Sequence, residues 1–207
     1  MQNNFSVIVF DLGNVLLSFD YQPAVDKLEK VEKGLGERFL SFYYNNYHYH
    51  RDFERGDLPE NDFIDVMLNA IDHKIDGATF CKYYSEIFSE NKEVVDLLPK
   101  LKKSFTLVLL SNTNIIHYKY GWKGYDFLDH FDHIVTSYEA HAVKPEEKIY
   151  ATVESLTGED PAGHFFIDDI QEYVDAARSL GWSGVQFKDY KSLSIELINR
   201  GILSYRD

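Results

Sequence analysis

The chain contains 207 residues, a length that fits one domain with an inserted subdomain and that can bury a full hydrophobic core. Its 34 acidic and 21 basic residues give a formal net charge of −13, and such a chain repels the phosphates of nucleic acids and anionic membranes. Neither a nucleic acid nor a membrane is therefore expected as a partner. A small anionic substrate would need a local positive charge or a metal ion in order to bind.

Cys81 is the only cysteine of the sequence, which excludes an internal disulfide and a zinc site built from several thiolates. The opening residues, Met1 to Asn4, carry no basic group, and the apolar run after them is too short for a signal peptide or a membrane span. We therefore expect a soluble, cytoplasmic protein. The sequence indicates no protein partner and leaves the oligomeric state open.

Short runs rich in β-branched and aromatic residues predict five strands. These strands cover positions 5–10, 105–110, 133–137, 164–167 and 184–187. Between the later runs, apolar residues recur at helical spacing. The helices predicted from this spacing cover positions 91–103, 145–156 and 170–180. Strands that are apolar throughout and alternate with helices indicate an α/β fold with a parallel, doubly wound sheet.

The stretch from 20 to 90 interrupts this alternation, because it shows helical patterns and no convincing strand. Its predicted helices cover positions 23–33, 37–47, 60–71 and 77–88. We expect this stretch to form a helical cap inserted after the first strand. The Rossmann-like core would then consist of residues 1–19 and 91–207.

Polar and charged side chains follow the predicted strands at the points where the strands end. They are Asp11 after the first strand, Ser111 and Asn112 after the second, Lys144 in a later loop, and Asp168 and Asp169 after the fourth. In a parallel sheet, groups just beyond the carboxyl ends of neighbouring strands meet in one crevice. A carboxylate nucleophile, a hydroxyl and an amide, an ammonium and an acidic pair are the parts needed for phosphoryl transfer through an aspartyl-phosphate with a bound divalent cation.

Taken singly, these residues also have structural explanations. Asp11 can cap a turn, Ser111 suits a helix N-terminus, and a lysine such as Lys144 is most often solvated. The adjacent carboxylates of Asp168 and Asp169 are the most informative signal, because they repel each other unless a cation binds between them. The combination of all four motifs favours the functional interpretation.

With these motifs in order, the chain resembles the haloacid dehalogenase superfamily, and within it the phosphatase-like members that carry a helical cap after the first strand. The resemblance spans essentially the whole chain and implies a Rossmann-like sheet with strand order 5-4-1-2-3. It also implies Mg²⁺ as the cofactor and a small phosphorylated metabolite as the substrate. The roles it implies are as follows: Asp11 as nucleophile, Gly13 as a carbonyl ligand of the metal, Ser111 and Asn112 as the phosphoryl clamp, Lys144 as the ammonium between nucleophile and phosphate, and Asp168 and Asp169 as metal carboxylates, with Asp169 favoured for direct coordination.

Gly13 departs from the pattern of most phosphatases of this superfamily, which carry a second aspartate at this position to protonate the leaving oxygen. The run Asp11-Leu12-Gly13-Asn14 resembles a subgroup that includes phosphatases of α-D-glucose 1-phosphate, and the motif at 53–57 fits that subgroup as well. Without a general acid, a leaving group that needs little protonation is favoured. Asp20 or a cap histidine is a possible replacement for the acid.

The cap contains many aromatic residues at helical spacing, most of which are expected to be core. They are Phe39, Phe42, Tyr43, Tyr44, Tyr47, Tyr49 and Phe53. His48 and His50 point to different faces of a helix and are expected to be solvated. Arg51 and Arg55 share a face, and Arg55 is the expected contact to the anionic or hydroxyl groups of the substrate.

The sequence leaves three functional classes open. The preferred one is a magnesium-dependent phosphatase of a small phosphomonoester such as a sugar phosphate. A hydrolytic 2-haloacid dehalogenase would share Asp11 as nucleophile but would not need the paired Asp168 and Asp169. A non-catalytic binding protein on the same fold is the third class, and Gly13 is its only support.

Overall fold

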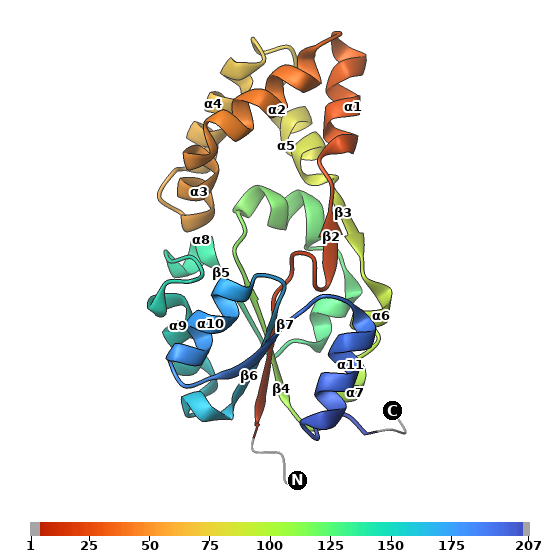
Figure 1. Ribbon diagram of the computed structural model, residues 1–207. Coiled ribbons are helices and arrows are strands. Elements are labelled where there is room, and N and C mark those ends of the chain that lie inside the picture. Colours follow the sequence, from red (N-terminus) through yellow and green to blue (C-terminus); the bar gives the residue numbers. More distant parts are fainter. Residues whose placement is uncertain (1–4, 205–207) are drawn as a thin grey trace.

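The computed structural model describes residues 5–204, so the opening segment 1–4 and the end 205–207 lie outside the description. It consists of a five-stranded α/β unit and a bundle of helices above it (Figure 1). Among the described residues, no helix combines the length and the apolar content that a membrane crossing requires.

The large sheet is parallel throughout and has the strand order β5-β4-β1-β6-β7. Its strands are β1 (Val7–Phe10), β4 (Thr106–Ser111), β5 (His133–Thr136), β6 (His164–Asp168) and β7 (Ser183–Gln186). Numbered one to five along the chain, these strands follow the expected order 5-4-1-2-3, read from the β7 edge. The predicted doubly wound α/β fold is therefore confirmed.

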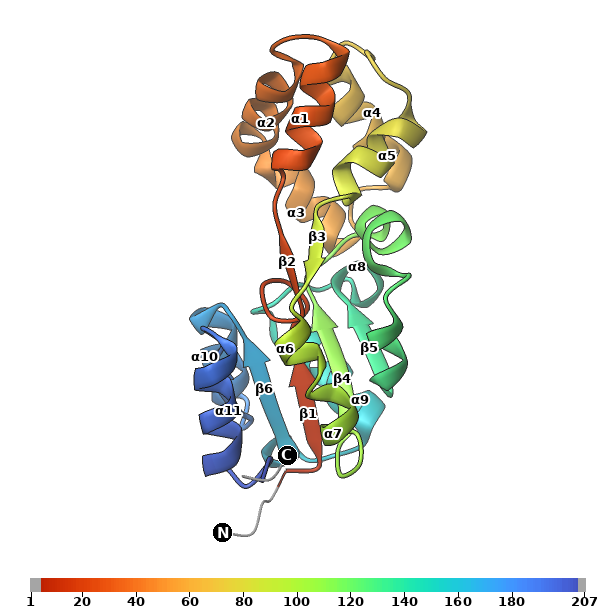
Figure 2. The ribbon, with the colours of Figure 1, turned by 90° about the vertical axis from the view of Figure 1, so that its right-hand side faces the viewer.

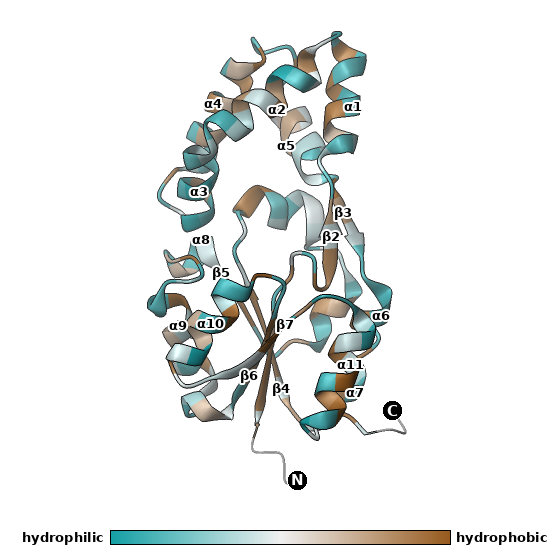
Figure 3. Ribbon diagram, in the orientation of Figure 1, coloured by the Kyte–Doolittle hydropathy of each residue, from teal (hydrophilic) through white to brown (hydrophobic). Residues whose placement is uncertain are grey.

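Alternate side chains of β1 enter two separate hydrophobic cores, one on each face of the sheet. Ile8 and Phe10 pack with residues from α6, α7 and α11, whereas Val7 and Val9 pack with residues from α9 and α10. The helices that cover the sheet are α6 (Lys92–Val95), α7 (Leu98–Leu101), α9 (Glu147–Thr157), α10 (Gln171–Ser179) and α11 (Tyr190–Asn199). Both faces of the central strand are thus buried, and the centre of the sheet is coloured as hydrophobic in Figure 3.

The bundle above the sheet has its own hydrophobic core, which centres on aromatic residues such as Phe39, Phe63 and Tyr84. Its helices are α1 (Gln22–Val31), α2 (Leu35–Asn45), α3 (Tyr47–Arg55), α4 (Glu60–Ala70) and α5 (Gly77–Ser85). We propose that the division expected from the sequence, a cap at 20–90 on a core at 1–19 and 91–207, describes these two packed units.

Two short antiparallel strands carry the chain into and out of the bundle. They are β2 (Leu17–Phe19) and β3 (Phe88–Glu90), paired so that Phe19 lies opposite Phe88. Figures 1 and 2 show them side by side between the sheet and the helices. The expectation that 20–90 lacks strands was wrong for β3, because a three-residue strand gives no periodic signal of its own and forms only through pairing with β2.

Several helix boundaries also differ from the prediction. The helix expected over 91–103 is divided into α6 and α7, and Pro99, which lacks a backbone N–H, lies in the first turn of the second piece. The helix expected over 37–47 ends at Asn45, and after Asn46 a second helix, α3, begins at Tyr47. The remaining segments are short: η1 (His117–Trp122), η2 (Asp126–His130), η3 (Pro161–Gly163) and α8 (Ser137–Ala140).

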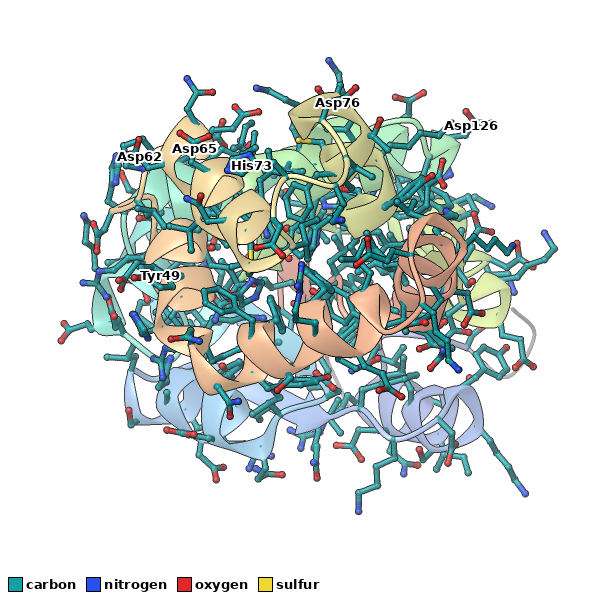
Figure 4. All side chains as sticks on the ribbon, turned by 90° about the horizontal axis from the view of Figure 1, so that it is seen from above. Tyr49, Asp62, Asp65, His73, Asp76 and Asp126 are labelled. Atoms are coloured by element: carbon teal, nitrogen blue, oxygen red, sulfur yellow. The ribbon has the colours of Figure 1, made fainter. Side chains whose placement is uncertain are left out.

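Acidic residues gather on the outside of the molecule. Seen from above, the side chains of Asp62, Asp65, Asp76 and Asp126 lie at the periphery and point outward (Figure 4). All four are exposed.

Candidate active site

The carboxyl ends of β1, β4 and β6 lie side by side and point toward the helical bundle (Figure 2). Phe10, the last residue of β1, is paired with Leu109 of β4 and with Ile167 of β6. The next residue, Asp11, donates its backbone N–H to the carbonyl of Ile167 at 2.9 Å. This register places the side chains that follow the three strands in one crevice, as the sequence predicted.

Lys144 lies at the centre of this crevice, with only 2% of its surface exposed. Its Nζ donates to Asp11 Oδ1 at 2.7 Å, to Asp168 Oδ2 at 2.6 Å and to the Leu110 carbonyl at 3.3 Å. A buried ammonium must be paired to remain charged, and here three acceptors surround it. The expectation that a lysine before Pro145 is most often solvated does not describe this residue.

Asn112 fixes the loop that carries this ammonium. Its side-chain Oδ1 accepts from the Lys144 backbone N–H at 2.8 Å, and its Nδ2 donates to the Lys144 carbonyl at 3.1 Å. The peptide bond between Lys144 and Pro145 is cis. Ser111 is buried beside Asn112 at the end of β4, and both residues line the main cavity of the site.

Three carboxylates form a cluster at the ends of β1 and β6. Asp11, Asp168 and Asp169 each offer an oxygen, and these atoms lie within 4.8 Å of one another. Both oxygens of Asp168 are already engaged, one by Lys144 Nζ and the other by the Ile170 N–H at 2.8 Å. Asp169 Oδ2 accepts from Asn14 Nδ2 at 3.0 Å. Hard oxygen ligands of this kind are those that Mg²⁺ prefers.

The charges of this cluster are not balanced by the protein alone. Burial raises the pKa of Asp11 from 3.8 to about 7; the Lys144 ammonium lowers it, and the carboxylates of Asp168 and Asp169 raise it further. Burial lowers the pKa of Lys144, but Asp11 and Asp168 outweigh that effect and raise it above its ordinary value. Burial likewise raises the pKa of Asp169. A bound cation would favour the ionised form of all three acids.

In the turn after Asp11, the left-handed residue is Asn14, whose φ is 55°, and not Gly13. A Cβ added to Gly13 would meet the Phe19 ring at 3.4 Å and Asp11 Oδ2 at 3.9 Å, which are ordinary contact distances. The backbone therefore does not require glycine here. The ring of Phe19 lies next to the position that a Cβ at residue 13 would occupy.

A cavity of about 220 Å³ lies between the sheet edge and the helical bundle. Its floor includes Gly13, Ser111 and Asn112. Its upper wall consists mainly of cap and linker side chains that can contact the organic part of a substrate: Phe19, Tyr21, Tyr43, Tyr44, Tyr47, His50, Glu54 and Phe88. The other cap rings singled out from the sequence are buried or half-buried in the bundle, as expected for most of them.

Residues that the sequence did not single out as site residues also reach this cavity. Tyr21 and His117 line it without belonging to a motif, and Glu54 lines it from the motif at 53–57, in which only Arg55 was singled out. His50, expected to be solvated, is buried and bonded to Glu54 and Tyr84. The sequence hints were the motif at 53–57 and the aromatic density of the cap, and neither distinguished the cavity wall from the bundle core.

Arg55 was expected to be a site residue, but the structure does not place it with the others in the crevice. Its guanidinium pairs with Glu146 in the core and with Asp57 at 3.1 Å, and it lines neither of the two cavities near the crevice. Arg51 does line the second cavity, together with Lys144. Arg55 therefore holds α3 against the loop after Lys144 and is not placed to contact a substrate.

A haloacid dehalogenase-like hydrolase family model matches residues 5–181, which is most of the chain. The chain belongs to the haloacid dehalogenase-like hydrolases. It is similar to a D-ribitol-5-phosphate phosphatase of Bacteroides thetaiotaomicron, with 23% identity over 186 residues that cover 86% of this chain and 90% of the relative.

Solved structures of this family share the fold over nearly the whole chain. A family enzyme of Bacteroides thetaiotaomicron superposes with a TM-score of 0.79 at 26% identity, covering 92% of this chain and 98% of that chain. The same enzyme has been solved in complex with magnesium and inorganic phosphate, with a TM-score of 0.75. L-2-haloacid dehalogenase from Xanthobacter autotrophicus, at 21% identity and a TM-score of 0.63 over 96% of this chain and 84% of that chain, shares the fold alone.

Proposed function

We propose that this hydrolase is a magnesium-dependent phosphatase of small phosphomonoesters that acts through an aspartyl-phosphate on Asp11. The observation that carries the proposal is the buried Lys144 ammonium bonded to both Asp11 and Asp168, next to Asp169. A dehalogenase acting by Asp11 attack on carbon would not need three carboxylates within 4.8 Å of one another. Phosphoryl transfer does, because a cation has to offset the negative charge of phosphate and nucleophile together.

Carboxylates and a backbone carbonyl fit magnesium, and the donor set in this crevice has that chemistry. Asp11, Asp169 and the Gly13 carbonyl would hold the ion. Asp168 would fix the position of Lys144 beside the ion, because its two oxygens bond to Lys144 and Ile170. When bound, the ion supplies positive charge that neutralises phosphoryl oxygens. The complex of the related Bacteroides enzyme with magnesium and phosphate supports this assignment.

The residues of the chain carry the two steps of the reaction. In the first, an Asp11 carboxylate oxygen bonds to phosphorus while the bond from phosphorus to the leaving oxygen breaks. Ser111 and Asn112 bind the phosphoryl oxygens, and Lys144 holds the nucleophile and the phosphoryl group together. In the second step, water attacks phosphorus, the bond to Asp11 breaks, and phosphate and the free carboxylate result.

The substrate class follows from the cavity and from the relatives. A volume of about 220 Å³ with aromatic walls and polar groups suits the ring or chain of one small sugar or polyol. α-D-Glucose 1-phosphate, suggested by the sequence motif, and D-ribitol 5-phosphate, suggested by the related phosphatase, are the first two candidates.

The test is phosphate release from a panel of sugar, polyol and aryl phosphates, with magnesium and with a chelator, alongside halide release from 2-chloropropionate. We expect magnesium-dependent release from at least one sugar or polyol phosphate and no halide release. Halide release without phosphate release would establish the dehalogenase alternative. Inactivity towards every compound would favour a binding protein on this fold.

The two acidic residues after β6 are expected to behave differently when each is changed to alanine. Asp169→Ala removes a carboxylate with an oxygen to offer the ion, so the magnesium concentration for half-maximal activity should rise at least about 10-fold. Asp168→Ala removes a partner of Lys144 and should mainly lower the unfolding temperature measured in chelator. A magnesium dependence weakened more by Asp168→Ala than by Asp169→Ala would reverse the assignment within the pair.

A further inference from the structure

A phosphatase acting on a sugar or polyol phosphate has to protonate a basic leaving oxygen, and this chain lacks the usual group for that step. The position two residues after the nucleophile is Gly13. The two replacements considered from the sequence are also misplaced, since Asp20 and His48 are exposed and line neither of the cavities near the crevice. Asp20 instead accepts from the Gln22 N–H at 2.9 Å. A different acid is needed if the proposed function holds.

We propose that Glu54 of the cap, paired with His50, is the acid that protonates the leaving oxygen and the base that later activates water. The inference rests on the phosphatase function proposed above. Glu54 lines the main cavity and also the second one, which contains Lys144. Among the described residues, those common to both linings are Tyr47, Glu54 and Asn112, and Glu54 is the carboxylic acid of the three.

His50 holds the Glu54 carboxylate in place. One helical turn before it on α3, His50 lies with its Nε2 3.0 Å from Glu54 Oε1, and its Nδ1 is 2.8 Å from the Tyr84 hydroxyl. The side chain of His50 is 5% exposed and that of Glu54 is 16% exposed. The histidine is therefore closed off in the bundle, while the carboxylate still reaches the cavity. A buried pair of this kind can share one proton and present it at the carboxyl that lines the cavity.

The backbone of Glu54 is anchored to the phosphoryl clamp. The Ser137 hydroxyl donates to the Glu54 carbonyl at 2.6 Å. The Ser137 hydroxyl oxygen also accepts from the Thr113 N–H at 2.9 Å. Thr113 directly follows Ser111 and Asn112 in the sequence. Close backbone contact extends to Gly56, where an added Cβ would lie 2.5 Å from the Tyr138 carbonyl. The cap therefore delivers Glu54 at a fixed position relative to the residues that hold the phosphoryl group.

Other titratable groups that face Glu54 hold their protons too firmly or not at all. Burial raises the pKa of Tyr47 to about 12, and burial also raises the pKa of Tyr21, Tyr84 and Tyr173, with the Glu54 carboxylate acting in the same direction in all four cases. Burial lowers the pKa of His117 well below its ordinary value, so that its ring is neutral. None of these groups is suited to donate a proton near neutral pH.

With this assignment, the protons balance over the two steps of the reaction. As the bond between phosphorus and the leaving oxygen breaks, the proton of the pair moves from the Glu54 carboxyl to that oxygen, and a neutral alcohol departs. In the second step the attacking water transfers a proton to Glu54 as its oxygen bonds to phosphorus. The pair regains its proton, and Asp11 regains its free carboxylate.

The test compares Glu54→Gln with Asp52→Asn, a matched change of acid to amide at an exposed position of the same helix. Each protein is assayed with magnesium on 4-nitrophenyl phosphate, whose leaving group needs no proton, and on the best alkyl phosphate of the panel. We expect Glu54→Gln to lower kcat/KM, which reports formation of the phosphoenzyme and not its hydrolysis, by about 10²- to 10³-fold on the alkyl phosphate but by less than about 10-fold on the aryl phosphate. Asp52→Asn should change neither. Because both substrates are assayed on one sample, the ratio of the two rates does not depend on the folded fraction.

Equal losses of kcat/KM on the two substrates in Glu54→Gln would show that Glu54 does not protonate the leaving oxygen and would overturn the inference. A wild-type protein that cleaves the aryl phosphate but no alkyl phosphate would overturn it as well, because a working donor permits alkyl leaving groups. The first result leaves the proposed function intact, and the second leaves the phosphatase chemistry intact but contradicts a sugar or polyol phosphate as the substrate. A wild-type protein that cleaves neither ester would instead overturn the proposed function itself, and this inference with it.

Discussion

Asp11→Asn is expected to lower phosphate release by at least about 10³-fold, because an amide is a far weaker nucleophile than a carboxylate. The side chain of Asp11 is held by Lys144 in the crevice, and asparagine keeps both the size and an oxygen for that bond. The loss should therefore appear in kcat. The measurement is phosphate release under saturating substrate and magnesium.

The same substitution should stabilise the protein in chelator at alkaline pH. The pKa of Asp11 is raised to about 7 by burial, so the folded state binds this proton more tightly than the unfolded state does. The stability contributed by the protonated carboxyl is present below the ordinary value of 3.8 and is lost as pH rises through about 7. Asparagine resembles the neutral acid at every pH. Its unfolding temperature should therefore exceed that of the wild type at about pH 8, and the difference should be smaller at about pH 5.

Deamidation of the asparagine back to aspartate has to be excluded by mass spectrometry of fresh protein. Turnover similar to the wild type in a sample free of aspartate would remove Asp11 from the role of nucleophile. A lower unfolding temperature than the wild type at alkaline pH would show that the bond to Lys144 outweighs the cost of burying the charge.

Lys144→Met is expected to have the largest effect on stability. The methionine fills much of the same volume but leaves Asp11 and Asp168 without their shared ammonium. Removing one partner of a buried ion pair costs about 3–5 kcal/mol, because the remaining charge stays buried and unpaired. Activity should fall as well, since nothing then holds the nucleophile and the phosphoryl group together.

The pH dependence identifies the cause of that loss. Without the ammonium, which lowers the pKa of Asp11 in the wild type, this carboxyl should take up its proton at higher pH. The deficit in the free energy of unfolding should therefore be larger at about pH 8 than at about pH 5, where protonation relieves the repulsion. Denaturant unfolding in chelator measures it. A deficit independent of pH would indicate lost packing instead of unpaired charge.

The sheet and the polar groups at its edge could be predicted because they depend on local patterns and one topological rule. Uniformly apolar runs such as Val7 to Phe10 indicate strands buried on both faces, and parallel strands bring their carboxyl ends together. Asp11, Ser111 and Asp168 directly follow or end such runs. Lys144 does not directly follow a predicted strand, so only the resemblance to the family predicted that its ammonium lies in the site.

The cap side of the site could not be predicted in this way. The helical spacing of Arg51 and Arg55 is correct, but it does not show that Arg55 faces Glu146 across the contact between cap and core. In the same way, no local pattern predicts that the Glu54 carbonyl bonds to Ser137, which lies 83 positions away. The strand pair β2 and β3 and the helix α11 also depend on packing against distant segments, and none of the three was predicted from local patterns.

The most direct test of a metal-dependent phosphatase is the magnesium dependence of phosphate release by the wild-type protein. Metal-stripped protein is assayed on 4-nitrophenyl phosphate while magnesium is added stepwise, and the unfolding temperature is followed in parallel. The cluster of Asp11, Asp168 and Asp169 predicts no turnover in chelator, saturable recovery with magnesium, and an unfolding temperature that rises over the same concentration range. Full turnover in excess chelator would contradict the assignment of this cluster as a magnesium site.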